Sequence, residues 1–215
     1  IEAEHLAETK PEQYEHEYLG KVTGTGGEVF TNVQIRPITD EEISDFDYLR
    51  RGIDWGYTTD PFCYVALCYD RKHKRIYIYY EYYAHGAKFD AITQAIRREN
   101  KTNHLIMAES ADPRSNAELV DRGLRVQKVK KQPGSVEHGI TWLQNLEAIV
   151  IDPVRCPNTA REFLHYELER DGNDGFREGF PDKDNHSIDA VRYALNTDMA
   201  KRRAKVLNKA QYGLH

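Results

Sequence analysis

Two apolar runs on either side of a short polar turn constrain the fold of this chain more than any other feature. The first run occupies residues 49–55 and carries Asp54 at its end, and the second occupies residues 62–69. A third run, residues 75–83, is rich in Ile and Tyr and follows a polar turn at residues 71–74. β-branched and aromatic residues favour strands, and short turns join antiparallel neighbours. The sequence therefore predicts an antiparallel meander of three strands, the first of which ends in a carboxylate.

Helical and strand patterns alternate after the meander. Apolar residues recur at helical spacing in residues 89–100, and short apolar runs further on indicate buried strands. Gly123 is suited to end a helix, and Ser135 and Asn185 are suited to begin one. We expect helices over 89–100, 115–122, 135–146, 158–170 and 185–201, and strands over 104–109, 124–129 and 148–151. This order predicts an α/β, ribonuclease-H-like fold of the integrase/resolvase type, with a central mixed sheet flanked by helices; a generic mixed α/β domain is the alternative.

Composition excludes several classes of protein. The 215 residues are 40% hydrophobic, which is enough for one buried core with extensions. No apolar run is long enough to cross a bilayer, and the first thirty residues lack the apolar segment of a signal peptide. Cys63 and Cys68 are expected on opposite faces of one strand, which argues against a disulfide scaffold or a Cys-x-x-Cys zinc site. We therefore expect a soluble, intracellular protein that does not bind membranes.

Four acidic residues stand out because of where the predicted elements place them. Asp54 and Glu109 end buried strands, Asp112 follows shortly after, and Asp189 lies in the last helix; Asp60, by contrast, is interpreted as a turn residue. Neighbouring strand ends share one rim of a sheet, and a helix across that rim can add a third carboxylate. Clustered carboxylates repel one another unless divalent cations neutralise them, and oxygen ligands suit Mg²⁺ or Mn²⁺. Two such ions about 3.5–4 Å apart can hydrolyse a phosphodiester.

Asp112 and His186 each also have a structural interpretation. Asp112 is either a second metal ligand or the residue that forms a turn. His186 shares a helical face with Asp189 and could transfer a proton or bind a metal. It could equally be a helix-start residue held by Asp182 or Asp184. The sequence leaves these alternatives open.

The formal net charge of −5 argues against binding of polyanions by the chain as a whole. Positive charge is nevertheless clustered at residues 97–98, 128–131 and 201–205. Such runs are often solvated faces, but an acidic average can also hide a basic groove around an acidic centre. A metal-dependent nuclease needs that arrangement.

Several segments resemble the nuclease domain of the large terminase subunit of tailed double-stranded-DNA bacteriophages. They are residues 53–56, 108–113, 130–140 and 185–194. The block His-Ser-Ile-Asp-Ala-Val-Arg-Tyr-Ala, which begins at His186, is the most specific of them. Residues 18–20 are also similar to the segment that trails from the preceding ATPase domain in this family, so that the resemblance covers roughly residues 14–198.

The resemblance implies a metal-dependent endonuclease that cuts concatemeric viral DNA during genome packaging. It implies that Asp54, Glu109 and Asp189 bind two Mg²⁺ or Mn²⁺ ions, with His186 beside them. Many members have Asp where this chain has Glu109, which leaves Asp112 as a rival for the second ligand. The ATPase motifs are absent from these residues, so we do not expect them to translocate DNA by themselves.

The resemblance also implies how the chain is divided and what it contacts. We expect the duplex backbone to be bound by Lys128, Lys130, Lys131 and Arg114. The expected partners are DNA, an ATPase domain of the same polypeptide, a small terminase subunit and a portal protein, in the host cytoplasm and not in the virion. The expected parts are a linker or arm trailing from an absent ATPase domain (1–45), the nuclease domain (46–198) and a basic tail (199–215).

Two other functions remain to be separated from this one. A Holliday-junction resolvase or transposase-like nuclease would share the fold and would prefer branched DNA. A non-catalytic module that docks the motor to the portal would use the acidic cluster for stability alone.

Overall fold

A mixed seven-stranded sheet runs through the part of the chain that the computed structural model describes, which is residues 26–56, 60–130, 132–172 and 175–199. Its strands are β1 (Val33–Ile35), β2 (Leu49–Asp54), β3 (Phe62–Asp70), β4 (Arg75–Ala84), β5 (Ile106–Ala108), β6 (Val126–Lys128) and β7 (Ala148–Ile151). In space they follow the order β1-β7-β4-β3-β2-β5-β6. β3 pairs antiparallel with β2 and β4, and the other pairs are parallel. The predicted meander within a mixed sheet is therefore confirmed.

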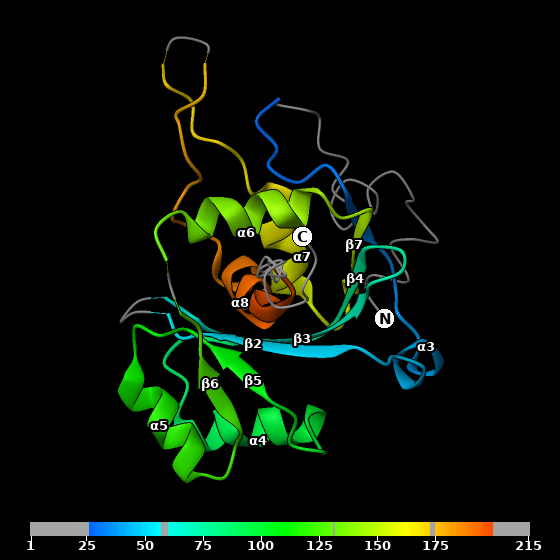
Figure 1. The fold of residues 1–215 in the computed structure, drawn as a ribbon, viewed down its shortest axis with the longest axis vertical. Helices are drawn as coiled ribbons and strands as arrows, with labels where there is room; N and C mark the ends of the chain where they lie inside the picture. The colour runs from blue at the N-terminus through cyan, green and yellow to red at the C-terminus, as the bar shows by residue number, and fades with distance from the viewer. Residues whose placement is uncertain (1–25, 57–59, 131, 173–174, 200–215) are drawn as a thin grey trace, which may run out of the picture.

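Helices cover both faces of this sheet (Figure 1). They are α3 (Asp40–Ser44), α4 (Phe89–Glu99), α5 (Pro113–Asp121), α6 (Ser135–Gln144), α7 (Pro157–His165), α8 (His186–Ala194) and α9 (Asn196–Met199). On one face, Phe163 of α7 and Val191 of α8 are buried in the largest core cluster. On the other face, Ile96 of α4 and Leu119 of α5 pack in a second cluster with Ile53 of β2. The sheet therefore separates two cores.

Helix α8 lies unusually close to β2. A Cβ atom on Gly52 would lie 1.9 Å from the carbonyl oxygen of Ala190, so only glycine leaves room for the helix backbone at this point. The same helix buries Ile188 and Val191 completely. The polar face of the first helical turn is thereby directed towards the carboxyl end of β2.

The helix predicted over residues 158–170 is shorter in the structure and ends at His165. The next residue, Tyr166, is extended, and its carbonyl accepts a hydrogen bond of 3.0 Å from the backbone N–H of Val29. Pairing with the segment before β1 thus ends the helix, and that partner is too distant in sequence for periodicity to reveal.

The last predicted helix, residues 185–201, is also interrupted. It ends at Ala194, and the separate short helix α9 follows. Asp198 in α9 is ion-paired with Arg50 at 2.6 Å and with Arg71 at 2.5 Å. Arg50 belongs to β2 and Arg71 to the β3–β4 turn. Their ion pairs with Asp198 hold α9 against this part of the sheet and account for the interruption of the helix.

Helix starts also differ from prediction. Gly134, with φ of 73°, is the residue before α6, and Ser135 is the first residue of that helix. Helix α7 begins at Pro157, a residue whose fixed φ suits the first helical position. Asn185 does precede α8, but it forms no capping hydrogen bond through its side chain.

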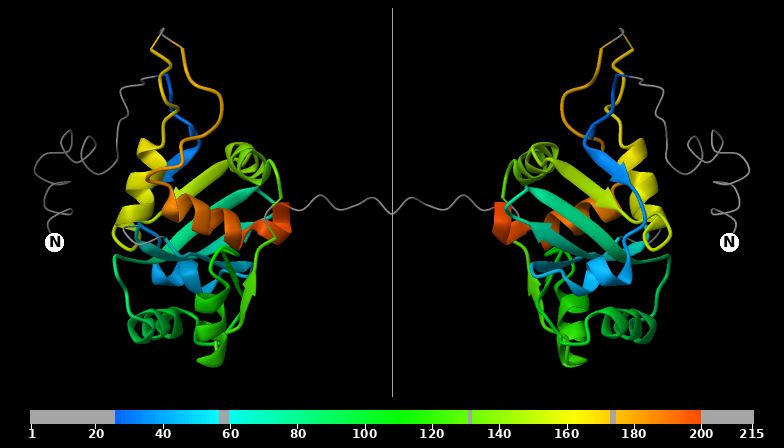
Figure 2. Two further views of the ribbon diagram at one scale, coloured as in Figure 1. Left: turned by 90° about the vertical axis from the view of Figure 1, so that its left-hand side faces the viewer. Right: turned by 90° about the vertical axis from the view of Figure 1, so that its right-hand side faces the viewer.

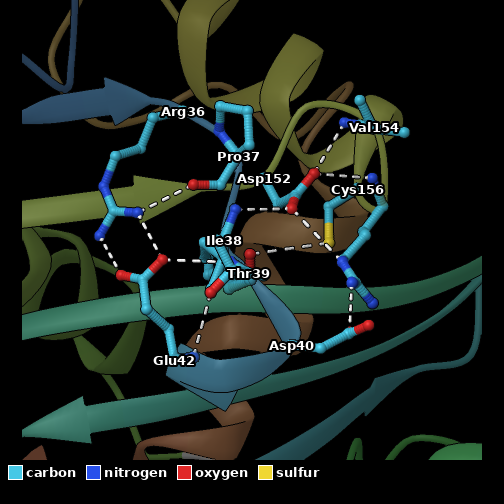
Figure 3. A network of polar contacts seen from close by, with 11 residues as sticks. Arg36, Pro37, Ile38, Thr39, Asp40, Glu42, Asp152, Val154 and Cys156 are labelled. Atoms are coloured by element: carbon cyan, nitrogen blue, oxygen red, sulfur yellow. Dashed lines mark hydrogen bonds and ion pairs between the residues drawn. The ribbon is translucent and has the colours of Figure 1, made fainter. Parts of the chain in front are cut away.

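Residues 26–44, which the sequence assigned to a linker or arm, pack against the rest of the sheet. β1 pairs with β7, and Val29 and Phe30 are buried in the largest core cluster. Figure 3 shows Asp152, just after β7, accepting a hydrogen bond of 2.9 Å from the backbone N–H of Ile38. The predicted boundary at residue 45 is therefore not an edge of the folded unit. The remainder of the expected arm (1–25) and most of the expected tail (200–215) lie outside the described residues.

The segment between α7 and α8 extends beyond the body of the domain (Figure 2). Arg170 and Phe176 form an antiparallel bridge within it. From that bridge the chain returns towards the sheet through Asp182 and Asp184, which reach the edge where β2 ends.

Candidate active site

A cleft of about 820 Å³ lies where β2 and β5 end and α8 begins. Asp54 is the last residue of β2, and Glu109 follows β5 directly. Because the two strands are parallel neighbours, the backbone N–H of Glu109 donates to the carbonyl of Ile53 at 3.0 Å. The cleft is lined by Asp54, Asp60, Pro61, Tyr83, His85, Glu109, Ala111, Asn158, Arg161, Asp182, Lys183, Asp184, Asn185, His186 and Asp189.

His186 connects α8 to β2. Its Nδ1 lies 3.1 Å from Oδ2 of Asp54, which is only 7% exposed. The imidazole also meets the ring of Tyr83 edge-on, with 6.5 Å between ring centroids. Asp182 and Asp184 line the same cleft, but the hydrogen bond of His186 is to Asp54. Of the alternatives left open by the sequence, the structure therefore favours a role next to the carboxylates.

Asp189 faces the cleft from the first turn of α8 and is held by Arg192. The Nη1 of Arg192 donates to Oδ1 of Asp189, and its Nη2 donates to the carbonyl of Ser135 at 3.1 Å. Oδ2 of Asp189 lies 3.5 Å from the hydroxyl of Tyr193. Arg192 is 6% exposed, so this buried guanidinium ties the start of α6 to the carboxylate.

The cleft concentrates negative charge. The pKa of Asp54 is raised to about 7: burial is the largest cause, the hydrogen bond from His186 opposes it, and the nearby Asp189 and Glu109 add to it. That hydrogen bond to Asp54 raises the pKa of His186, although burial of the ring opposes it. A proton on His186 and a negative charge on Asp54 therefore stabilise each other.

Within the described residues, no group of His, Cys, Asp or Glu side chains is close enough to hold a metal ion as it stands. The chemistry of the donors nevertheless fits a hard divalent cation, because Asp54, Glu109 and Asp189 offer carboxylate oxygens to one cleft. The raised pKa of Asp54 shows that this cleft favours added positive charge. Charge and ligand type therefore fit such an ion.

Asp112 has a different role from Glu109 in the structure. It precedes α5, where its Oδ1 accepts from the backbone N–H of Ser115 at 3.0 Å and its Oδ2 accepts from the Ser115 hydroxyl at 2.6 Å. Burial would raise the pKa of Asp112, but these hydrogen bonds outweigh it and lower the pKa. Asp112 does not line the cleft. The structure thus shows Asp112 as the cap of α5, as neither a metal ligand nor only a turn residue, and leaves Glu109 as the second carboxylate.

Three of the four predicted DNA-binding residues are described by the structure, and they lie outside the cleft. Lys128, Lys130 and Arg114 are exposed, and Lys131 lies outside the described residues. Lys128 is nevertheless paired in register with Ala108, the residue before Glu109. These cations are therefore on the rim next to the carboxylates and not among them.

Sequence reasoning missed several residues that line the cleft. Tyr83 reaches it because Asp54 pairs with Cys63 and Cys63 pairs with Tyr83, which places the three residues in one row across the sheet. Counting register along the predicted meander could have identified Tyr83. Arg161 of α7 and Asp60 also line the cleft, and no local pattern marks either of them.

No helix among the described residues is long and apolar enough to cross a membrane.

Comparison with known proteins agrees with this geometry. The family model described as the terminase RNase H-like domain matches residues 54–197. The chain is 42% identical over 204 residues to the terminase large subunit of Bacillus phage SPP1, which covers 93% of this chain and 48% of that protein. It is 30% identical over 147 residues to the PBSX phage terminase large subunit of Bacillus subtilis strain 168, which covers 68% of this chain and 34% of that protein. The chain thus spans half or less of these relatives.

A solved structure also matches most of this chain. The crystal structure of the g2p (large terminase) nuclease domain from bacteriophage SPP1, with bound Mn, has a TM-score of 0.74 and 42% identity. The match covers 79% of this chain and 98% of that one. The predicted ribonuclease-H-like fold is confirmed, and so is the resemblance stated from the sequence. This chain belongs to the terminase RNase H-like domain family.

Proposed function

We propose that this chain is the nuclease domain of a DNA-packaging motor and cuts concatemeric double-stranded viral DNA by metal-dependent hydrolysis of phosphodiester bonds. The observation that carries the proposal is the meeting of Asp54, Glu109 and Asp189 in one cleft beside His186. Membership of the terminase family supports it against a resolvase or transposase-like nuclease.

We assign Asp54, Glu109 and Asp189 as the residues that would hold divalent cations, Mg²⁺ or Mn²⁺, and infer two ions. The related SPP1 nuclease domain was solved with bound Mn, which supports this assignment. Cations held there would supply an activated water and stabilise the leaving oxygen.

The remaining residues of the site orient these carboxylates. Nδ1 of His186 lies 3.1 Å from Oδ2 of Asp54, so a protonated imidazole donates to this oxygen and holds the carboxylate in place. Arg192 similarly holds Oδ1 of Asp189. Both bonds fix carboxylate directions before any ligand arrives, which reduces the reorganisation that binding requires.

Duplex DNA would contact the rim through its backbone. Lys128, Lys130 and Arg114 are exposed near the ends of β5 and β6, and Arg161 lines the cleft on the α7 side. Backbone contacts carry little sequence information, so we infer a nuclease with little sequence specificity. Lys131 belongs to the same proposal through its place in the basic run.

The matched relatives are longer than this chain, which supports an ATPase domain in the same polypeptide. We further propose the small terminase subunit and the portal protein as partners and the host cytoplasm as the place of action. These follow from the packaging role and not from a contact in the structure.

Cleavage of supercoiled plasmid tests the proposal. With Mn²⁺ the chain should nick and linearise the plasmid, and EDTA should abolish this. Asp54→Ala and Asp189→Ala should each lower the rate by about a hundredfold or more, since metal-ion catalysis contributes several kcal/mol. Intact plasmid with the folded parent protein would favour the docking module, and a preference for four-way junctions would favour the resolvase.

A further inference from the structure

Glu162 is a buried carboxylate for which the proposed chemistry has no direct use. It lies in α7 and is 2% exposed. Its Oε2 accepts hydrogen bonds from both the backbone N–H of Ser187, at 2.7 Å, and the Ser187 hydroxyl. Its Oε1 accepts from the hydroxyl of Tyr83 at 2.7 Å. Every one of these donors belongs to a neighbour of His186, in sequence or in space.

The bonds to Ser187 replace a missing helix cap. The first N–H groups of a helix have no partner within it, and the residue before the helix usually satisfies one of them. Asn185 precedes α8 but makes no such bond through its side chain. Glu162 takes over that function from another helix, and its negative charge suits the positive end of the α8 dipole.

Helix α7 is itself capped in the same manner. Glu81 of β4 accepts from the backbone N–H and the side chain of Asn158, at 3.0 and 2.7 Å, and from both groups of Thr159, at 2.8 Å each. The sheet therefore fixes the start of α7 through the half-buried carboxylate of Glu81. Helix α7 in turn fixes the start of α8 through the buried carboxylate of Glu162. This succession ends at the helical turn that carries His186 and Asp189.

We propose that Glu162 is a positioning residue that sets the first turn of α8, and with it His186 and Asp189, at the place where they meet Asp54. The proposal rests on the metal-dependent function inferred above. It also explains the serine in the His-Ser-Ile-Asp block: Ser187 is fully buried and gives both its backbone N–H and its hydroxyl to Glu162. Tyr83, held by the other oxygen, supports the imidazole of His186 from the side.

The test measures Mn²⁺ binding without DNA, from the electron paramagnetic resonance signal of free Mn²⁺, for the folded 215-residue chain. Glu162→Gln keeps the side-chain volume but removes the charge and one acceptor. We expect it to weaken Mn²⁺ affinity by about 10- to 100-fold, the usual effect of residues that orient metal ligands. Cleavage by Glu162→Gln should recover towards the parent rate when Mn²⁺ is raised in the same proportion.

Asp152→Asn is the matched control. Asp152 is also 2% exposed and also accepts from backbone N–H groups, but it lies after β7 and does not line the cleft. Its variant should lose thermal stability and keep the parent Mn²⁺ affinity. Ser187→Ala removes the hydroxyl donor alone, and we expect about fivefold weaker binding from the loss of one hydrogen bond.

The outcomes separate the two proposals. If the parent chain binds Mn²⁺ and both Glu162→Gln and Ser187→Ala bind it equally well, with only a lower melting temperature, Glu162 is structural and the positioning role is wrong. If the parent chain itself binds no Mn²⁺ and cuts no plasmid, the metal-dependent function fails first. If Glu162→Gln does not fold, the Mn²⁺ affinity of Ser187→Ala alone tests the positioning role.

Discussion

Asp54 and Asp152 occupy equivalent places in the sheet but have opposite surroundings. Each is buried at the carboxyl end of a strand, β2 for Asp54 and β7 for Asp152, and these strands run in the same direction. Asp152 accepts from the backbone N–H groups of Ile38, Val154 and Arg155, each at 2.9 Å. Asp54 instead faces other carboxylates and has His186 as its hydrogen-bond partner.

The difference shows what separates an anchor from a binding site. A buried carboxylate surrounded by N–H donors is satisfied and stabilises the turn that it caps. A buried carboxylate among like charges has too few hydrogen-bond donors to offset its charge. For Asp54, burial together with Asp189 and Glu109 raises the pKa to about 7. Of the two carboxylates, only Asp54 is therefore expected to attract a cation.

Stability in the absence of metal should show the largest contrast. Asp152→Ala leaves the buried N–H of Ile38 without an acceptor, and we expect a loss of about 2 to 4 kcal/mol in the free energy of unfolding. Asp54→Asn should cause no loss at pH 8, because ionised Asp54 is unfavourable above its raised pKa of about 7. Urea unfolding in EDTA measures both. Equal losses of unfolding free energy in the two variants would contradict the proposed difference between Asp54 and Asp152.

Stabilisation by metal should reverse that contrast. At an Mn²⁺ concentration about a hundred times the dissociation constant, binding to the folded state should add about 2.7 kcal/mol to the stability of the parent chain. Asp152→Asn should gain as much as the parent, and Asp54→Asn should gain almost nothing. Repeating the urea titrations with Mn²⁺ gives the result, and a full gain in Asp54→Asn would place the ion elsewhere.

The smallest expected effect concerns the edge of the sheet to which we propose that DNA binds. Lys128→Ala with Lys130→Ala should lower the slope of log affinity against log salt by about 2, since each phosphate contact contributes about 0.9. The loss should be the same for unrelated duplex sequences. Lys72→Ala with Lys101→Ala, a pair of exposed lysines away from the cleft, is the matched control and should leave the slope unchanged. An equal fall in the control would mean that the chain binds DNA without a preferred edge.

Local patterns predicted what depends on neighbours in sequence. The meander and the alternation of later strands and helices follow from periodicity and turn residues, and they are present in the structure. The meeting of Asp54 and Glu109 follows from the ends of two buried strands.

What could not be predicted depends on long-range partners. The early end of α7 arises from pairing with Val29, and the inclusion of residues 26–44 in the domain arises from the contact between Ile38 and Asp152. Glu162 gave no signal, because its role depends on two other elements meeting around it. A single glutamate in an amphipathic helix looks like many others until its partners are known.

The hydrogen bond between His186 and Asp54 joins residues 132 positions apart in the chain. During synthesis, β2 and β5 emerge long before α8, so a growing chain carries Asp54 and Glu109 without the helix that completes the cleft. Contacts between such distant residues form late in folding. The nuclease activity proposed here therefore requires that α8 has packed onto β2, and a chain interrupted before that helix would lack both His186 and Asp189.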